Sequence, residues 1–294
     1  MEIHKEDPVS SVLLAYVTEQ VSALKAQEIQ VRQGAPDSVH KMRVAIRCLR
    51  SVVATYGVLL DIDVVDRLRE ELKWLGLVLG AERDAEVMRK RILESVESNL
   101  TGSEYASATH HLGEQLTADF DAAHLEVLET LKEGRYLQLL HDLDSLLAEP
   151  PLTTFAYEPI KKIVPSLVKE DLIRLARTVA ELKEGPIDRE SALHEVRKRA
   201  KRLRYAAETA ALVHYKWASK LAGAAKEVQT ILGDYHDSIV ARDLLRRLSD
   251  QVAARDAGDL DFELLTQLEE HAAEMSEIRF HEAWKRFPPT SLEK

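Results

Sequence analysis

Two segments hold most of the residues that could do chemistry, and each opens with a histidine followed by cations. They span residues 39–50 and 193–204, and they align at an offset of 154 residues. One histidine, two arginines, a further cation and a leucine coincide. Arginine offers a planar fork of N–H donors to phosphate oxygens, lysine adds a mobile charge, and a histidine beside a phosphate is held protonated. These residue types predict binding of a phosphate or a chain of phosphates.

At helical spacing four aligned positions of each segment form a cationic strip about 80° wide with apolar residues opposite, and Lys198 and Arg202 widen the second strip. The first strip contains His40, Arg43, Arg47 and Arg50. The second contains His194, Arg197, Lys198, Lys201, Arg202 and Arg204. A solvated helix face usually interleaves both signs, but residues 194–204 carry six Lys or Arg and one acid, which repel one another unless an anion is bound. The pattern therefore predicts one anion site shared by the two helices.

A second pair of blocks aligns at an offset of 153 residues. Lys73 aligns with Lys226, and Leu-Gly-x3-Asp recurs at 79–84 and 232–237. A proline-containing polar turn precedes each basic segment, at 34–37 and 185–188, and predicts a helix N-cap in both copies. Equal spacing of separate blocks indicates a tandem duplication of a helical unit.

The glycines of the Leu-Gly blocks are expected to end their helices as left-handed caps. Arg83 and His236 would then lie near the start of the next helix, where an anion is favoured. Together with Lys73 and Lys226 they are predicted to be secondary ligands. Asp84 and Asp237 are interpreted as N-caps or as partners of a nearby arginine.

The composition agrees with a helical protein. The 294 residues allow one large domain or two units of about 145. With 11 glycines and 9 prolines, the chain has too few turn formers for a sandwich or barrel of many short strands. Apolar residues recur at helical spacing along nearly every long segment. We therefore predict an all-α fold.

The prolines at 150 and 151 divide the chain near its midpoint. The first half, residues 8–148, and the second, residues 159–287, are each expected to form a four-helix bundle, with a linker at 149–158. The helices of the first half are predicted at 9–33, 38–60, 62–79, 83–132 with a break near 99–102, and 135–148. Those of the second are predicted at 160–184, 190–213, 216–232 and 236–286, with an interruption around 257–259.

Charge and cysteine content exclude several classes of protein. The net charge of −10 disfavours indiscriminate binding to nucleic acid or anionic lipid, so an anion site must be local. A single cysteine, Cys48, excludes an intrachain disulfide and a cysteine-built zinc site. The first residues lack a signal core, and no apolar run is long enough to span a bilayer. A cytoplasmic protein without membrane attachment is expected.

Enzymatic alternatives have weaker support. The doublets His141-Asp142 and His236-Asp237 are similar to those of metal-dependent helical phosphohydrolases, but no further ligands are identifiable. The chain has no glycine-rich phosphate loop and no nucleophile elbow. Its few aromatic residues disfavour single-stranded nucleic acid.

The two basic segments and the two Leu-Gly-x3-Asp blocks resemble the CHAD family, the conserved histidine α-helical domain, over residues 8–287. This resemblance implies two four-helix bundles related by a pseudo-twofold axis, with a basic channel between them that binds inorganic polyphosphate. It also implies a stand-alone member associated with polyphosphate granules, because no partner domain fits in the remaining residues. The implied channel ligands are His40, Arg43, Arg47, Arg50, Lys73, His194, Arg197, Lys201, Arg204 and Lys226. The first copy has Val44 and Cys48 where the second has Lys198 and Arg202, which implies weaker binding by the first half.

The sequence thus predicts a non-catalytic protein that binds inorganic polyphosphate and needs no cofactor or metal. Ten phosphate contacts would give a log–log salt slope of about −7 to −9. A metal-dependent phosphohydrolase and a helical scaffold that docks an acidic protein partner are the alternatives. Homo-oligomers and granule-associated proteins stay open as further partners.

Overall fold

The computed structural model describes residues 3–183, 185, 188–253 and 262–288. In these ranges it has α-helices and two short 3-10 helices (η1, η2), with isolated β-bridges but no strand. They are α1 (Val9–Arg32), α2 (Ser38–Tyr56), η1 (Gly57–Leu59), α3 (Ile62–Asn99), α4 (Gly102–Thr130), α5 (Gly134–Ala148), η2 (Thr154–Tyr157), α6 (Ile160–Lys183), α7 (Arg189–Ala211), α8 (Lys216–Ala253) and α9 (Phe262–Lys285). The predicted all-α fold is confirmed. None of these helices has a stretch long and apolar enough to cross a bilayer.

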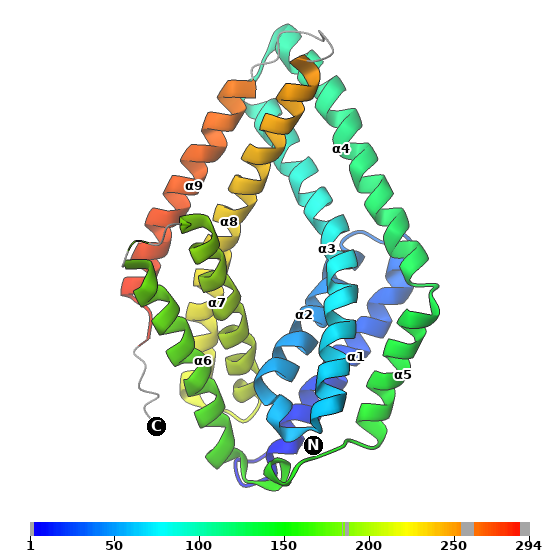
Figure 1. Ribbon diagram of the computed structural model, residues 1–294, viewed down its shortest axis with the longest axis vertical. Coiled ribbons are helices and arrows are strands. Elements are labelled where there is room, and N and C mark those ends of the chain that lie inside the picture. Colours follow the sequence, from blue (N-terminus) through cyan, green and yellow to red (C-terminus); the bar gives the residue numbers. More distant parts are fainter. Residues whose placement is uncertain (1–2, 184, 186–187, 254–261, 289–294) are drawn as a thin grey trace.

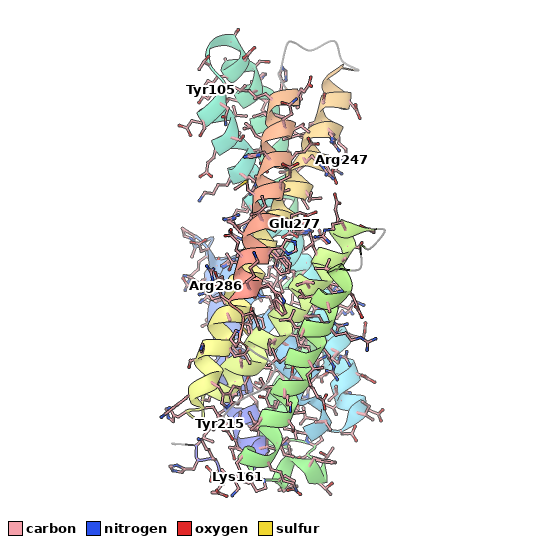
Figure 2. The ribbon with its side chains drawn as sticks, turned by 90° about the vertical axis from the view of Figure 1, so that its left-hand side faces the viewer. Tyr105, Lys161, Tyr215, Arg247, Glu277 and Arg286 are labelled. Atoms are coloured by element: carbon pink, nitrogen blue, oxygen red, sulfur yellow. The ribbon has the colours of Figure 1, made fainter. Side chains whose placement is uncertain are left out.

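The helices form two sides of an elongated molecule (Figure 1). Helices α1–α5 make one side and α6–α9 the other, and most consecutive long helices pack against each other. Seen after a quarter turn, Tyr105 near the start of α4 marks one end and Lys161 at the start of α6 the other (Figure 2). The basic segments lie on α2 and α7, and these two helices are in contact across the two sides.

Apolar packing holds α2 and α7 in place. The predicted apolar faces are buried: Met42, Ile46, Leu49 and Val53 on α2, and Val196, Ala200, Leu203 and Ala207 on α7. They belong to one core that continues through both sides. Burying one large aliphatic side chain contributes about 1.5–3 kcal/mol, so the core outweighs substantial repulsion on the opposite faces. The cationic strips are therefore positioned by the apolar residues behind them.

The predicted helix ends at Gly80 and Gly233 are wrong. Both glycines lie inside continuous helices, α3 and α8, and neither has a positive φ. A single glycine costs a helix only about 1 kcal/mol, and buried residues such as Leu75 and Ile92 continue the apolar face on both sides of Gly80. Arg83 and His236 thus lie within helices and gain nothing from a helix N-terminus. The predicted break near 99–102 is confirmed.

The two predicted N-caps behave differently. The Asp188 carboxylate accepts a hydrogen bond of 3.0 Å from the Ser191 amide at the start of α7. Asp37 has a left-handed backbone with φ of 57°, and its side chain makes no capping bond. Instead the Ser38 hydroxyl donates to the Ala35 carbonyl at 2.7 Å. The interruption predicted around 257–259 lies outside the described residues, as do Pro186 and Ile187.

The two sides also meet at the end of the molecule opposite the segment that contains Pro150 and Pro151. A second apolar cluster there joins α3 and α4 to α8 and α9. Nearby, Arg91 of α3 binds both carboxylate oxygens of Glu269 on α9, with Nε–Oε1 and Nη2–Oε2 distances of 2.9 and 2.6 Å. Its Nη2 also donates to the Ser238 hydroxyl of α8 at 2.7 Å. Glu269 is only 5% exposed, so this bidentate pair is a buried ion pair that links the two sides.

Arg91→Met should lower the free energy of unfolding by about 3 kcal/mol, because it leaves the Glu269 carboxylate buried and unpaired. The double variant Arg91→Met/Glu269→Leu should recover most of this loss. Urea unfolding followed by circular dichroism measures both. Arg246→Met, which removes an exposed pair between α8 and Glu270 of α9, is the control and should change stability by less than about 0.5 kcal/mol. Equal losses of unfolding free energy in Arg91→Met and Arg246→Met would contradict a stabilising role for the buried Arg91–Glu269 ion pair.

Candidate functional site

A cavity of about 560 Å³ opens between α2, α3 and α7. We call it the α2–α3–α7 groove. Its charged lining residues are Arg43, Arg47, Arg50, Arg69, Lys73, Lys198, Arg199, Lys201 and Arg202, with Glu70 and Glu195. Nine cations thus face two carboxylates in a chain whose net charge is −10.

The groove brings together half of the predicted ligands. Arg43, Arg47, Arg50, Lys73, Lys198, Lys201 and Arg202 line it, whereas His40, Arg83, His194, Arg197, Arg204, Lys226 and His236 do not. The sequence analysis missed two cations. Arg69 lies one helical turn before Lys73, and Arg199 belongs to the second basic segment but falls outside its strip. Helical spacing from Lys73 could have identified Arg69.

Three groove cations have no carboxylate within ion-pair distance in the described part of the chain. Arg47 donates through Nε to the Tyr205 hydroxyl on α7 at 2.6 Å, which holds its guanidinium between the helices. Arg50 lies over the backbone of α3, where a Cβ on Gly76 would stand 3.3 Å from its Nη1. Lys201 has no ion-pair or hydrogen-bond partner among the residues that the structure describes, and it lies among arginines. These three are ready to accept an anion.

Lys201 is the most strongly perturbed of these cations. Burial, followed by repulsion from Arg197, Arg47 and Arg43, lowers its pKa to about 7, whereas Asp84 opposes the shift. The lysine is therefore about half protonated near neutral pH. An anion bound beside it would stabilise its charged form.

Other groove cations already have partners. Arg43 pairs with Asp84 of α3 at 3.2 Å, so Asp84 is an arginine partner and not an N-cap. Lys198 pairs with Glu195 on its own helix. Lys73 lies 3.9 Å from Glu70, a loose exposed pair. These pairs can open to an anion at small cost, because exposed ion pairs contribute about 0–1 kcal/mol.

Arg202 is held more firmly. Its Nε lies 2.8 Å from the buried Asp171 carboxylate of α6, and its Nη2 donates to the Ala54 carbonyl of α2 at 2.8 Å. Asp171 also accepts from the Thr55 hydroxyl at 2.8 Å. Arg202 therefore joins α2, α6 and α7, and its charge is largely neutralised by Asp171.

The histidines lie beside the groove. His194 and His236 bring their rings within 5.2 Å of each other and line a separate cavity of about 300 Å³. Burial lowers the pKa of both rings, and of His40, below the usual value, and nearby cations lower them further. All three are neutral at pH 7 in the free protein.

The environment of Arg197 repeats that of Arg43. A Cβ on Gly233 would stand 3.5 Å from Arg197 Nη2, just as one on Gly80 would stand 3.6 Å from Arg43 Nη2. In each repeated Leu-Gly block, the glycine thus leaves room for an arginine of the basic helix to pack against the backbone of the neighbouring helix. Buried Nε of Arg197 has no hydrogen-bond acceptor among the described residues.

The remaining predicted ligands are paired or distant from the groove lining. Arg83 pairs with Glu86 on its own helix. Arg204 donates through Nε to Glu208 at 2.7 Å and through Nη1 to Gln229 at 3.4 Å. Lys226 is exposed on α8.

The two His-Asp doublets do not come together. His141 lies on α5 and His236 on α8, on opposite sides of the molecule (Figure 1). Within the described ranges no three His, Cys, Asp or Glu side chains are grouped as a metal site requires.

Solved structures share the fold at low sequence identity. PptA from Streptomyces chartreusis superposes with a TM-score of 0.78 over 95% of this chain and 99% of that one, at 21% identity. The crystal structure of the CHAD domain from the plant Ricinus communis superposes with a TM-score of 0.66 over 97% of this chain and 89% of its own, at 20% identity.

Sequence comparison finds nearer relatives. Two uncharacterised proteins of Mycobacterium tuberculosis, MT2285 of strain CDC 1551 / Oshkosh and Rv2226 of strain ATCC 25618 / H37Rv, are each 33% identical over 266 residues. The match covers 88% of this chain and 49% of each relative, so the chain spans about half their length. The CHAD domain family model matches residues 15–246, well over half of the chain. The chain therefore belongs to the CHAD family.

Proposed function

We propose that this protein binds inorganic polyphosphate in the α2–α3–α7 groove and does not process it. The observation that carries the proposal is the set of nine cations facing two carboxylates along one groove. Repulsion among so many like charges is relieved by a ligand with several anionic groups. Membership of the CHAD family supports the same ligand.

The spacing of the cations favours a repeating anion over a single phosphate. Arg43, Arg47 and Arg50 are neighbours along α2, with about 5–6 Å between successive Cβ atoms. Lys73 extends the set onto α3, and Lys198 extends it onto α7. A linear chain of phosphates can contact all three helices at once, whereas one phosphate group can occupy only part of the groove.

We also propose that the two sides are tandem copies of one bundle related by a pseudo-twofold axis. Support comes from the matching Arg43–Gly80 and Arg197–Gly233 contacts, which fall at aligned positions of the two copies. Binding of the same polymer would bring the protein to cytoplasmic polyphosphate granules.

The triple variant Arg47→Gln/Arg50→Gln/Lys198→Gln should weaken binding to polyphosphate about 100-fold at low salt, because it removes three charge-assisted contacts. One contact from each of the nine groove cations predicts a log–log salt slope of about −6 to −8, and the variant should lose about 2 to 3 of it. A salt-titrated assay with polyphosphate, DNA, RNA and ATP measures both quantities and the selectivity.

The control is Lys90→Gln/Lys132→Gln/Lys161→Gln, which removes the same charge from three exposed lysines outside the groove. It should bind within about twofold of the wild type, because screening is strong beyond about 10 Å at 0.1 M salt. Equal weakening in the two triple variants would reject the groove as the site. Phosphate release from bound polyphosphate would contradict a non-catalytic role.

Binding should weaken as the pH rises from 7 to 9. Lys201 has a pKa of about 7 in the free protein, with Arg43 and Arg47 of α2, Arg197 of α7 and Asp84 of α3 around it. A bound anion raises that pKa, so binding takes up a proton above pH 7, and affinity falls by up to about tenfold per pH unit until the pKa of the complex is passed.

Isothermal titration calorimetry in buffers of different ionisation enthalpy measures the proton uptake directly. Lys201→Met should bind more weakly at pH 7 and should lose the part of the pH dependence between 7 and 9. A wild-type affinity that is constant over this range would contradict the role given to Lys201.

A further inference from the structure

The sequence alignment of the two copies maps the groove onto a counterpart set of residues, and Arg47 and Lys201, which exchange places, belong to both. At the offsets of 154 and 153 residues, its α2 and α3 positions map onto α7 and α8, and its α7 positions map onto α2. We call the mapped set the counterpart surface. Its residues that differ in charge or size from the groove are Lys41, Val44, Ala45, Cys48, Ala200, Tyr205, Glu208, Ala222, Gly223 and Gln229. The two surfaces can therefore be compared position by position.

Cations that line the groove are replaced by apolar residues on the counterpart surface. Lys198, Arg199 and Arg202 of α7 map onto Val44, Ala45 and Cys48 of α2, and Arg69 maps onto Ala222. Ala45 and Cys48 are buried, and Val44 packs against the main core. Glu70 and Glu195 of the groove map onto Gly223 and Lys41, so at these two positions the counterpart surface is the more positive one. On balance the counterpart surface is less cationic.

Arg50 and Arg204 occupy aligned positions but differ in their partners. Arg50 has no carboxylate within ion-pair distance among the described residues, and its neighbours Ala54 and Gly76 leave its guanidinium open to the groove. At the matching positions Glu208 and Gln229 both bind Arg204, whose side chain is only 18% exposed. The carboxylate of Glu208 would also repel a polyanion. Arg204 is thus already bound by two side chains, whereas Arg50 is available to bind an anion.

We infer that polyphosphate is held by the α2–α3–α7 groove alone and that the counterpart surface supports the fold without binding the anion. This inference rests on the proposed function. The sequence implied weaker binding by the first half, and the inference reverses that expectation. The additional cations of α7 lie at the interface between the two sides and face α3 of the first half. The second half supplies charge to a groove built on the first.

Lys73 and Lys226 give a matched test, because they occupy aligned positions on α3 and α8 and both are exposed. Lys73→Glu and Lys226→Glu change the net charge equally, and circular dichroism should show unchanged helicity in both. Polyphosphate of defined chain length is titrated into each protein at 0.15 M salt, where exposed charges are screened beyond about 8 Å. Lys73→Glu should weaken binding about tenfold, whereas Lys226→Glu should stay within about twofold of the wild type.

The outcomes separate the inference from the proposed function. Equal weakening by both variants, a larger effect of Lys226→Glu, or no effect of either would overturn the one-sided assignment while polyphosphate binding still stands. A wild type that fails to bind polyphosphate would overturn the proposed function itself. Glu208→Gln supplies a second measurement: binding should be unchanged, and tighter binding would show that the counterpart surface contacts the anion.

Discussion

The structure depends on keeping two cationic helices, α2 and α7, in contact despite the repulsion between their charges. Lys201 shows how strong the opposing force is, because burial and three arginines lower its pKa to about 7. Apolar packing behind α2 and α7 supplies the main compensation. Polar contacts between the helices also compensate for the repulsion, notably the Arg47–Tyr205 hydrogen bond and the Arg202–Asp171 ion pair. The free protein therefore carries electrostatic strain that an anion can relieve, which is a common cost of a preorganised binding site.

The same constraint explains the surroundings of the site. Two of the arginines lie against helix backbone at Gly80 and Gly233, which spreads the guanidinium groups away from one another. Asp84 pairs with Arg43 and also opposes the pKa shift of Lys201, so one carboxylate moderates two cations. More acids at the interface would lower the repulsion further, but they would also repel the ligand.

Periodicity and duplication predicted much of this arrangement. They identified the all-α fold, the apolar faces of α2 and α7 and seven of the groove cations, but they divided α3 and α8 at Gly80 and Gly233. Gly80 was misinterpreted because a glycine near the end of an apolar stretch fits a cap and a close helix contact equally well, and only the crossing arginine distinguishes them. Periodicity also gives the face of each helix but not which neighbour it meets. That Lys198 faces α3 follows from the crossing of α2 and α7, which no local pattern encodes.

Net charge and groove charge act together in selecting a ligand. With a net charge of −10, most of the surface repels polyanions, and attraction is confined to the groove. Double-stranded DNA carries one charge per about 1.7 Å of axis, but a rigid duplex bound at the groove would bring its other phosphates against acidic surface. A thin, flexible chain of phosphates brings comparable charge density without that contact. Under the proposed function, an acidic chain with a local cationic groove would discriminate by the shape and flexibility of a polyanion as well as by its charge.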